Sequence, residues 1–228
     1  MLTYFQTLAD QSPLPLVLAS AGGMPVEVIA DLAGHSKILG VVEGDAERIA
    51  QIKTATASVK REVVVTHVFA AVTKRMLARK DEQAGSTFIA MKTLTKTATA
   101  LAVAPPMPAL KTRTKMKGLQ VLAGTTASML AGLRADADGA MPAFGACAPQ
   151  ATYEVFAACK DGDEALAEEK QARIQAAAKR IESQFGSAGV RYGCDLNGYF
   201  GGQPRLPLLP VSGEQRTQIE ALMQTIRN

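Results

Sequence analysis

Three acidic side chains follow a short apolar run and could do chemistry together. Glu43, Asp45 and Glu47 come directly after the run Lys37 to Val42 (KILGVV), which is typical of a buried strand. Carboxylates gathered at the end of a strand could bind a metal ion. A solvated loop and first helical turn explains the same spacing, because acidic groups stabilise the amino-terminal end of a helix. We favour this second interpretation.

Histidine and cysteine are placed too sparsely for a metal centre. No carboxylate or cysteine lies at metal-ligand spacing from His35 or His67, so we expect no zinc and no other metal site. Cys147, Cys159 and Cys194 are odd in number and widely spaced. This pattern predicts buried free thiols rather than a disulfide framework.

Two segments could bind an anion. Gly124, Thr125 and Thr126 precede a helix, whose amino-terminal N–H groups could hold one, although a threonine cap is the interpretation we favour. Lys111 to Lys117 (KTRTKMK) presents alternate basic residues that could neutralise phosphates. We favour a solvated strand edge there, with Lys111, Arg113, Lys115 and Lys117 exposed, because no aromatic side chains alternate with them to stack bases. Nucleic acid is therefore not the expected partner.

The basic residues are concentrated in one internal stretch. The chain has a net charge of +4, yet residues 51–117 hold 13 basic side chains against three acidic ones. The remainder is acidic, so we interpret 51–117 as a basic insertion within a single domain that covers 1–228. Its composition predicts strands at 62–69 and 87–91 and a helix at 70–80.

Outside that stretch, short apolar runs alternate with amphipathic segments, which indicates βα units and a parallel α/β sheet. Predicted strands cover 14–20, 37–42, 119–123 and 138–144, and they should lie side by side because right-handed βα connections place successive strands next to each other. Predicted helices begin at Pro25, after Gly44, after Thr126, at Pro149, after Asp163 and at Gly213. These are about four βα units, half of an eight-stranded barrel.

Several blocks resemble one known family. Tyr4 to Ala19, His35 to Ile49 and Leu119 to Gly124 resemble strand regions five, six and seven of the dihydrodipicolinate synthase and N-acetylneuraminate lyase family, and Asp138 to Pro149 resembles the eighth. The most specific block is Gly186 to Val211, which is similar to the family's carboxy-terminal segment. The resemblance implies a partial TIM (β/α)8 barrel that lacks the first four strands.

The resemblance also implies a chemistry. The family forms a Schiff base between a strand-borne Lys and a 2-oxo acid, usually pyruvate, with a Tyr relaying protons and no cofactor. The Lys position corresponds to Val42 and the Tyr position to Ala19, so neither catalytic side chain is intact. Substrate-binding positions correspond to Gly124, Met141 and Ala143.

Three functions stay open at this point. The chain could be an inactive lyase, an aldolase that uses Lys92 or Lys96 as its amine, or an interaction protein that binds through the basic insertion. A half-barrel exposes a strand edge and an apolar face, which could be covered by the insertion or by a second copy of the chain. A third possibility is that Met1 is an internal start and the other half of the barrel is missing from this sequence. We favour the third. With no signal peptide and no apolar run of membrane-spanning length, we expect a cytoplasmic protein.

Overall fold

A computed structural model describes residues 1–20, 23–66 and 112–226. The chain divides into two compact units, one of Met1–Glu62 with Met116–Asn228 and the other of Val63–Lys115. Several sequence predictions therefore lie outside the described residues. They are His67, Lys92, Lys96, Lys111, the strand at 87–91 and the helix at 70–80.

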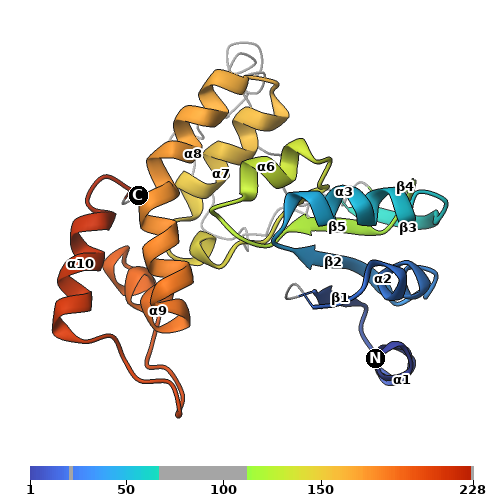
Figure 1. The fold of residues 1–228 in the computed structure, drawn as a ribbon, viewed down its shortest axis with the longest axis horizontal. Coiled ribbons are helices and arrows are strands. Elements are labelled where there is room, and N and C mark those ends of the chain that lie inside the picture. Colours follow the sequence, from blue (N-terminus) through green and yellow to red (C-terminus); the bar gives the residue numbers. More distant parts are fainter. Residues whose placement is uncertain (21–22, 67–111, 227–228) are drawn as a thin grey trace, which may run out of the picture. The chain divides into compact units, whose positions relative to one another are not determined.

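The first unit is built on a four-stranded parallel sheet. Its strands are β1 (Leu16–Ala19), β2 (Ile38–Glu43), β5 (Gln120–Ala123) and β6 (Gly139–Ala140), hydrogen-bonded in that order. Figure 1 shows β1, β2 and β5 side by side. The predicted parallel, adjacent order is confirmed, although β2 and β5 are neighbours in space with 44–119 between them in sequence.

Helices cover one face of this sheet. α2 (Val26–Ala33), α3 (Ala46–Ala55) and α6 (Met129–Arg134) follow β1, β2 and β5 respectively, and α1 (Leu2–Gln11) precedes the sheet. Ile29 and Leu32 of α2 and Ile49 and Ile52 of α3 are fully buried, at the three-residue spacing that forms one helix face. As predicted, α2 begins after Pro25; Gly34 is its carboxy-terminal cap.

The fourth strand is much shorter than predicted. Instead of 138–144, β6 is only Gly139–Ala140, and a 3-10 helix, η2 (Ala143–Ala146), follows Pro142. Proline has no N–H to donate to a neighbouring strand, so pairing stops there. Phe144 then turns inward and is completely buried.

The carboxy-terminal region is helical. α7 (Pro149–Lys160) begins at a proline, and Asp163 caps α8 (Glu164–Ala178) by accepting a hydrogen bond from Leu166 N. A π-helical turn, η3 (Lys179–Gln184), leads to α9 (Gly186–Leu196), and α10 (Gly213–Met223) starts at a capping box. Both predicted starts, Pro149 and Asp163, are confirmed.

A separate two-stranded sheet pairs β3 (Arg61–Thr66) with β4 (Thr112–Lys117). β3 falls within the predicted strand 62–69 except for its first residue. In β4, the side chain of Lys117 is exposed and that of Lys115 is half-buried. The side chain of Arg113 is not among those that the structure describes. The expectation of an exposed basic stripe thus holds for Lys117 and in part for Lys115. That 51–117 is an insertion stays a prediction.

Cysteine burial follows the sequence prediction in two cases of three. All three thiols are free, with Cys147 and Cys194 buried and Cys159 half-buried. Burial raises the pKa of Cys147 to about 12, and it also raises the pKa of Cys194, so both thiols are protonated near neutral pH. Across the described ranges, no helix is long and apolar enough to cross a membrane.

Candidate functional site

One row of residues crosses all four strands at their carboxyl ends. In the register of the sheet, Ala19 pairs with Val42, Val42 with Leu122, and Leu122 with Gly139. Residues paired in this way point to the same face of a parallel sheet. The neighbouring positions Leu18, Val41 and Val121 are buried under the helices. The row therefore lies on the opposite face.

This row contains both positions at which the resemblance places catalytic side chains. Ala19 is exposed and Val42 is half-buried, and they lie next to each other on β1 and β2. Neither carries a group that can attack a carbonyl or transfer a proton. Leu122 and Gly139 complete the row and add only apolar surface.

The three predicted substrate-binding residues are only partly brought together. Met141 lines a pocket of about 450 Å³ beside β6, walled mainly by apolar side chains including Leu122, Met129 and Phe156. Gly124 lies elsewhere, against Val42: a Cβ added to Gly124 would come 2.7 Å from Val42 Cγ1. Ala143 is exposed in η2 and does not line the pocket. No Lys or Arg among the described residues lines this pocket, so an anion has no charged partner from them.

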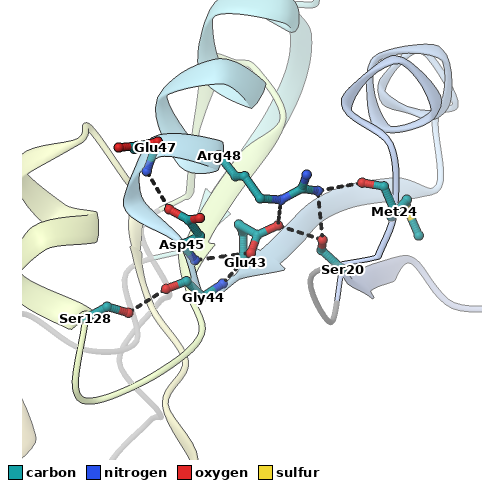
Figure 2. Close-up of polar contacts among 8 residues, drawn as sticks. All are labelled: Ser20, Met24, Glu43, Gly44, Asp45, Glu47, Arg48 and Ser128. Carbon is teal, nitrogen blue, oxygen red and sulfur yellow. Dashed lines mark hydrogen bonds and ion pairs between the residues drawn. The ribbon is translucent and has the colours of Figure 1, made fainter.

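A polar cluster lies on the helix-covered face of the sheet. Its residues Ser20 and Glu43 directly follow Ala19 and Val42 of the row in sequence. Figure 2 shows Glu43 at its centre, with both carboxylate oxygens occupied. Ser20 Oγ donates to Oε2 at 2.6 Å and Arg48 Nε donates to the same oxygen at 2.9 Å. The backbone N–H groups of Gly44 and Asp45 donate to Oε1 at 2.8 and 3.2 Å. Arg48 also reaches Met24 O at 2.5 Å.

The cluster joins the loops that follow β1 and β2. Glu43 is only 2% exposed, and both of its carboxylate oxygens accept hydrogen bonds from within the protein. Burial alone would raise the pKa of this carboxyl, but hydrogen bonds from Ser20, Arg48 and two backbone amides outweigh it and hold the pKa below its ordinary value of 4.5. Glu43 is therefore ionised near neutral pH and fixes the loops rather than facing a substrate.

The three acidic residues of the sequence motif consequently have different roles. Asp45 is the amino-terminal cap of α3 and accepts a hydrogen bond from Glu47 N at 2.8 Å, while Glu47 is exposed. The prediction of a solvated loop and first helical turn is right for these two. It is wrong for Glu43, which is buried. Strand alternation carried the signal, since Glu43 shares the parity of the buried Val41.

Sequence reasoning missed Ser20 and Arg48, and it assigned the wrong cap to α6. The cap residue is Ser128, not a threonine, and its side chain makes no capping hydrogen bond. Ser128 Oγ instead donates to Gly44 O at 2.5 Å and contacts Thr125 Oγ1, which ties this loop to the one after β2. Thr125 is not the cap residue of α6, but its Oγ1 accepts a hydrogen bond from Ser128 N at 3.3 Å, so the threonine prediction is right about a side-chain cap in this turn and wrong about its position.

The remaining candidate residues do not assemble into a site. His35 Nε2 lies 3.0 Å from Asp10 Oδ1, a pair at the surface that links α1 to the turn before β2. In the part of the chain that the structure describes, no three His, Cys, Asp or Glu side chains are grouped so that they could hold a metal ion.

Parallel βα units, helices on one face and a candidate row at the carboxyl ends of the strands define part of a (β/α)8 barrel. The sequence model of the Dihydrodipicolinate synthetase family matches residues 91–226, more than half of the chain. The chain belongs to this family. The match begins inside the stretch predicted to be an insertion, so 91–117 takes part in the family resemblance.

Solved structures extend the likeness of fold over nearly the whole chain. A dihydrodipicolinate synthase from Bacillus anthracis is 16% identical with a TM-score of 0.68, covering 100% of this chain and 60% of that one. A putative dihydrodipicolinate synthase from Thermus thermophilus is 18% identical with a TM-score of 0.63, covering 98% and 59%. One from Thermotoga maritima gives 14% identity and a TM-score of 0.64, covering 98% and 59%. The chain thus spans about 60% of the length of these structures.

Proposed function

We propose that this chain is a member of the dihydrodipicolinate synthase family that does not form a Schiff base with a 2-oxo acid. One observation carries the proposal: the row Ala19, Val42, Leu122 and Gly139 holds no amine and no hydroxyl. Imine formation needs an amine nitrogen that attacks the carbonyl carbon to give a carbinolamine, which then loses water. Valine has no lone pair, so rearranging its surroundings cannot supply this step.

Trapping with borohydride tests the proposal. The chain is incubated with pyruvate and sodium borohydride, which reduces any imine to a stable secondary amine, and is then analysed by intact mass and peptide mapping. We expect no adduct and no aldol cleavage, because losing a covalent route removes many orders of magnitude in rate. An active Schiff-base aldolase treated in parallel shows that the trap works. An adduct at Lys92 or Lys96 would mean that another amine does the chemistry.

We further propose that a second set of strands, supplied by a second copy or by the rest of a barrel, packs over the face of the sheet opposite the helices. Two features support this. Leu14 and Val17 at the β1 end are 68% and 49% exposed, and the apolar pocket of about 450 Å³ lies at the opposite edge, beside β6. Four parallel strands are half of the eight that close a barrel, and in the described sheet β1 and β6 each have a strand neighbour on one side only, so further strands could pair with their outer edges.

Sedimentation velocity at increasing protein concentration tests the second copy as the occupant. We expect a species of twice 24.0 kDa that Val17→Asp converts to the monomer, because a carboxylate would then be buried between the copies. Leu206→Asp serves as the matched control, since Leu206 is 84% exposed and lies in the carboxy-terminal region, away from the sheet. A wild-type chain that remains monomeric throughout would exclude the second copy.

A further inference from the structure

The carboxy-terminal block that carries the strongest family resemblance also forms a small polar pocket. Its volume is about 170 Å³, and it lies between α9, the loop at 202–204 and the start of α10. α9 contributes Ala188, Arg191, Tyr192 and Asp195, which share one face at helical spacing. Arg216 of α10 completes the wall. None of the residues in the sheet row takes part.

Gly201 fixes the loop against α9 and so shapes one wall of the pocket. Gly201 N donates to Asp195 Oδ1 at 2.8 Å, and Arg191 Nη1 donates to Gly201 O at 2.6 Å. The approach is so close that a Cβ on Gly201 would lie 1.9 Å from Arg191 O. Gly202 follows with φ +68°, a conformation that favours glycine. The loop therefore has a defined position, and its contact with Gly201 O holds the exposed Arg191 side chain beside it.

The charges that line the pocket are unequal. Two guanidinium groups, those of Arg191 and Arg216, face one carboxylate, that of Asp195, which is already bonded to Gly201 N. Neither arginine forms an ion pair with any carboxylate in the residues that the structure describes. The guanidinium carbon of Arg216 lies 5.4 Å from the centre of the Tyr192 ring, a contact that orients Arg216 while leaving its N–H donors available.

We propose that this pocket binds a small phosphate-class dianion through Arg191 and Arg216. Guanidinium groups offer paired N–H donors that match phosphate oxygens, and charge-assisted bonds of this kind are the stronger hydrogen bonds in proteins. The size limits the ligand, because drug-sized or nucleotide-sized molecules occupy pockets of about 300–1,000 Å³. A single phosphate group fits within the space described. The assignment does not depend on whether the sheet row is catalytic.

Titration of the full chain with inorganic phosphate at constant ionic strength tests the proposal. We expect saturable one-to-one binding by calorimetry, with amide NMR shifts centred on Gly202. Arg216→Gln should weaken binding at least about tenfold, which corresponds to about 1.4 kcal/mol. The Arg216 side chain is exposed and donates no hydrogen bond within the described part of the fold, so the variant loses only its surface contact with the Tyr192 ring, about 0.5–1 kcal/mol, and should stay folded with a melting temperature lowered by a few degrees at most.

Arg205→Gln is the matched control. Arg205 is exposed in the same loop region but does not line the pocket, so its loss removes the same charge and should change affinity less than about twofold. Equal weakening by both variants would reduce the effect to general charge attraction and overturn the site, as would the absence of saturable binding. Malonate that binds more tightly than phosphate would overturn the phosphate assignment, since it would identify carboxylates as the recognised group.

Discussion

Replacing Glu43 by alanine should lower the free energy of unfolding by about 3 kcal/mol, because removing one partner of a buried ion pair leaves the other charge uncompensated. Arg48 would lose its carboxylate, and the amides of Gly44 and Asp45 would lose their acceptor. The side chain of Arg48 is 24% exposed, so water can solvate part of its charge in the variant. The expected loss of stability is therefore at the lower end of the range for buried ion pairs. Chemical denaturation followed by far-ultraviolet circular dichroism measures it.

The pH dependence separates the charge of Glu43 from its packing. Since the folded pKa is held below the ordinary value of 4.5, the ionised carboxylate stabilises the fold above that pH, and this contribution is lost as the pH falls through the folded pKa. The difference between wild type and Glu43→Ala should therefore shrink in acid. Glu47→Ala, which removes an exposed carboxylate four residues away, should change stability little at any pH. A difference that stays constant into acid would show that the ion pair contributes nothing.

Phe144→Ala should destabilise the protein by about 3–5 kcal/mol, the usual result of emptying an aromatic site in a core. Phe144 has no exposed surface, and it anchors the 3-10 helix that replaces the rest of the fourth strand. Its backbone oxygen also accepts a hydrogen bond from the Cys147 thiol at 3.2 Å. The cavity would therefore open where the end of the sheet meets the carboxy-terminal helices.

Phe200→Ala provides the comparison for that measurement. Phe200 is 94% exposed, so the same truncation should change the free energy of unfolding by less than about 0.5 kcal/mol. Both variants are followed by the same denaturation experiment. A loss at Phe144 as small as that at Phe200 would mean that the core around η2 is not well packed.

Residue patterns predicted the positions of the strands better than their lengths. The apolar runs near Leu16, Ile38 and Val121 each form a strand, because a strand buried under helices needs an unbroken run of apolar residues. The segment 138–144 also contains apolar residues, yet Pro142 ends the pairing and Phe144 turns into the core. Tertiary packing decided this boundary, and local pattern alone does not contain that information.

Some residues of the candidate site could be placed from the sequence, and others could not. Val42 and Ala19 were placed by resemblance, and the register of the sheet puts them side by side. Ser20 and Arg48 could not be linked to Glu43 from the sequence, because they approach it from a different loop and from the first turn of a helix. Likewise, Gly124 and Met141 were grouped as substrate contacts, although only Met141 lines the pocket beside β6.

The pairing of β2 with β5 has a consequence for the entropy of the unfolded chain. The connection between these strands is about four times longer than the one between β1 and β2, yet closure entropy grows only with the logarithm of length. The added length therefore costs only about 1 kcal/mol, far less than the sheet gains from pairing and burial. A long segment at this point hardly weakens the sheet, so selection can change its length and composition while the two strands stay neighbours.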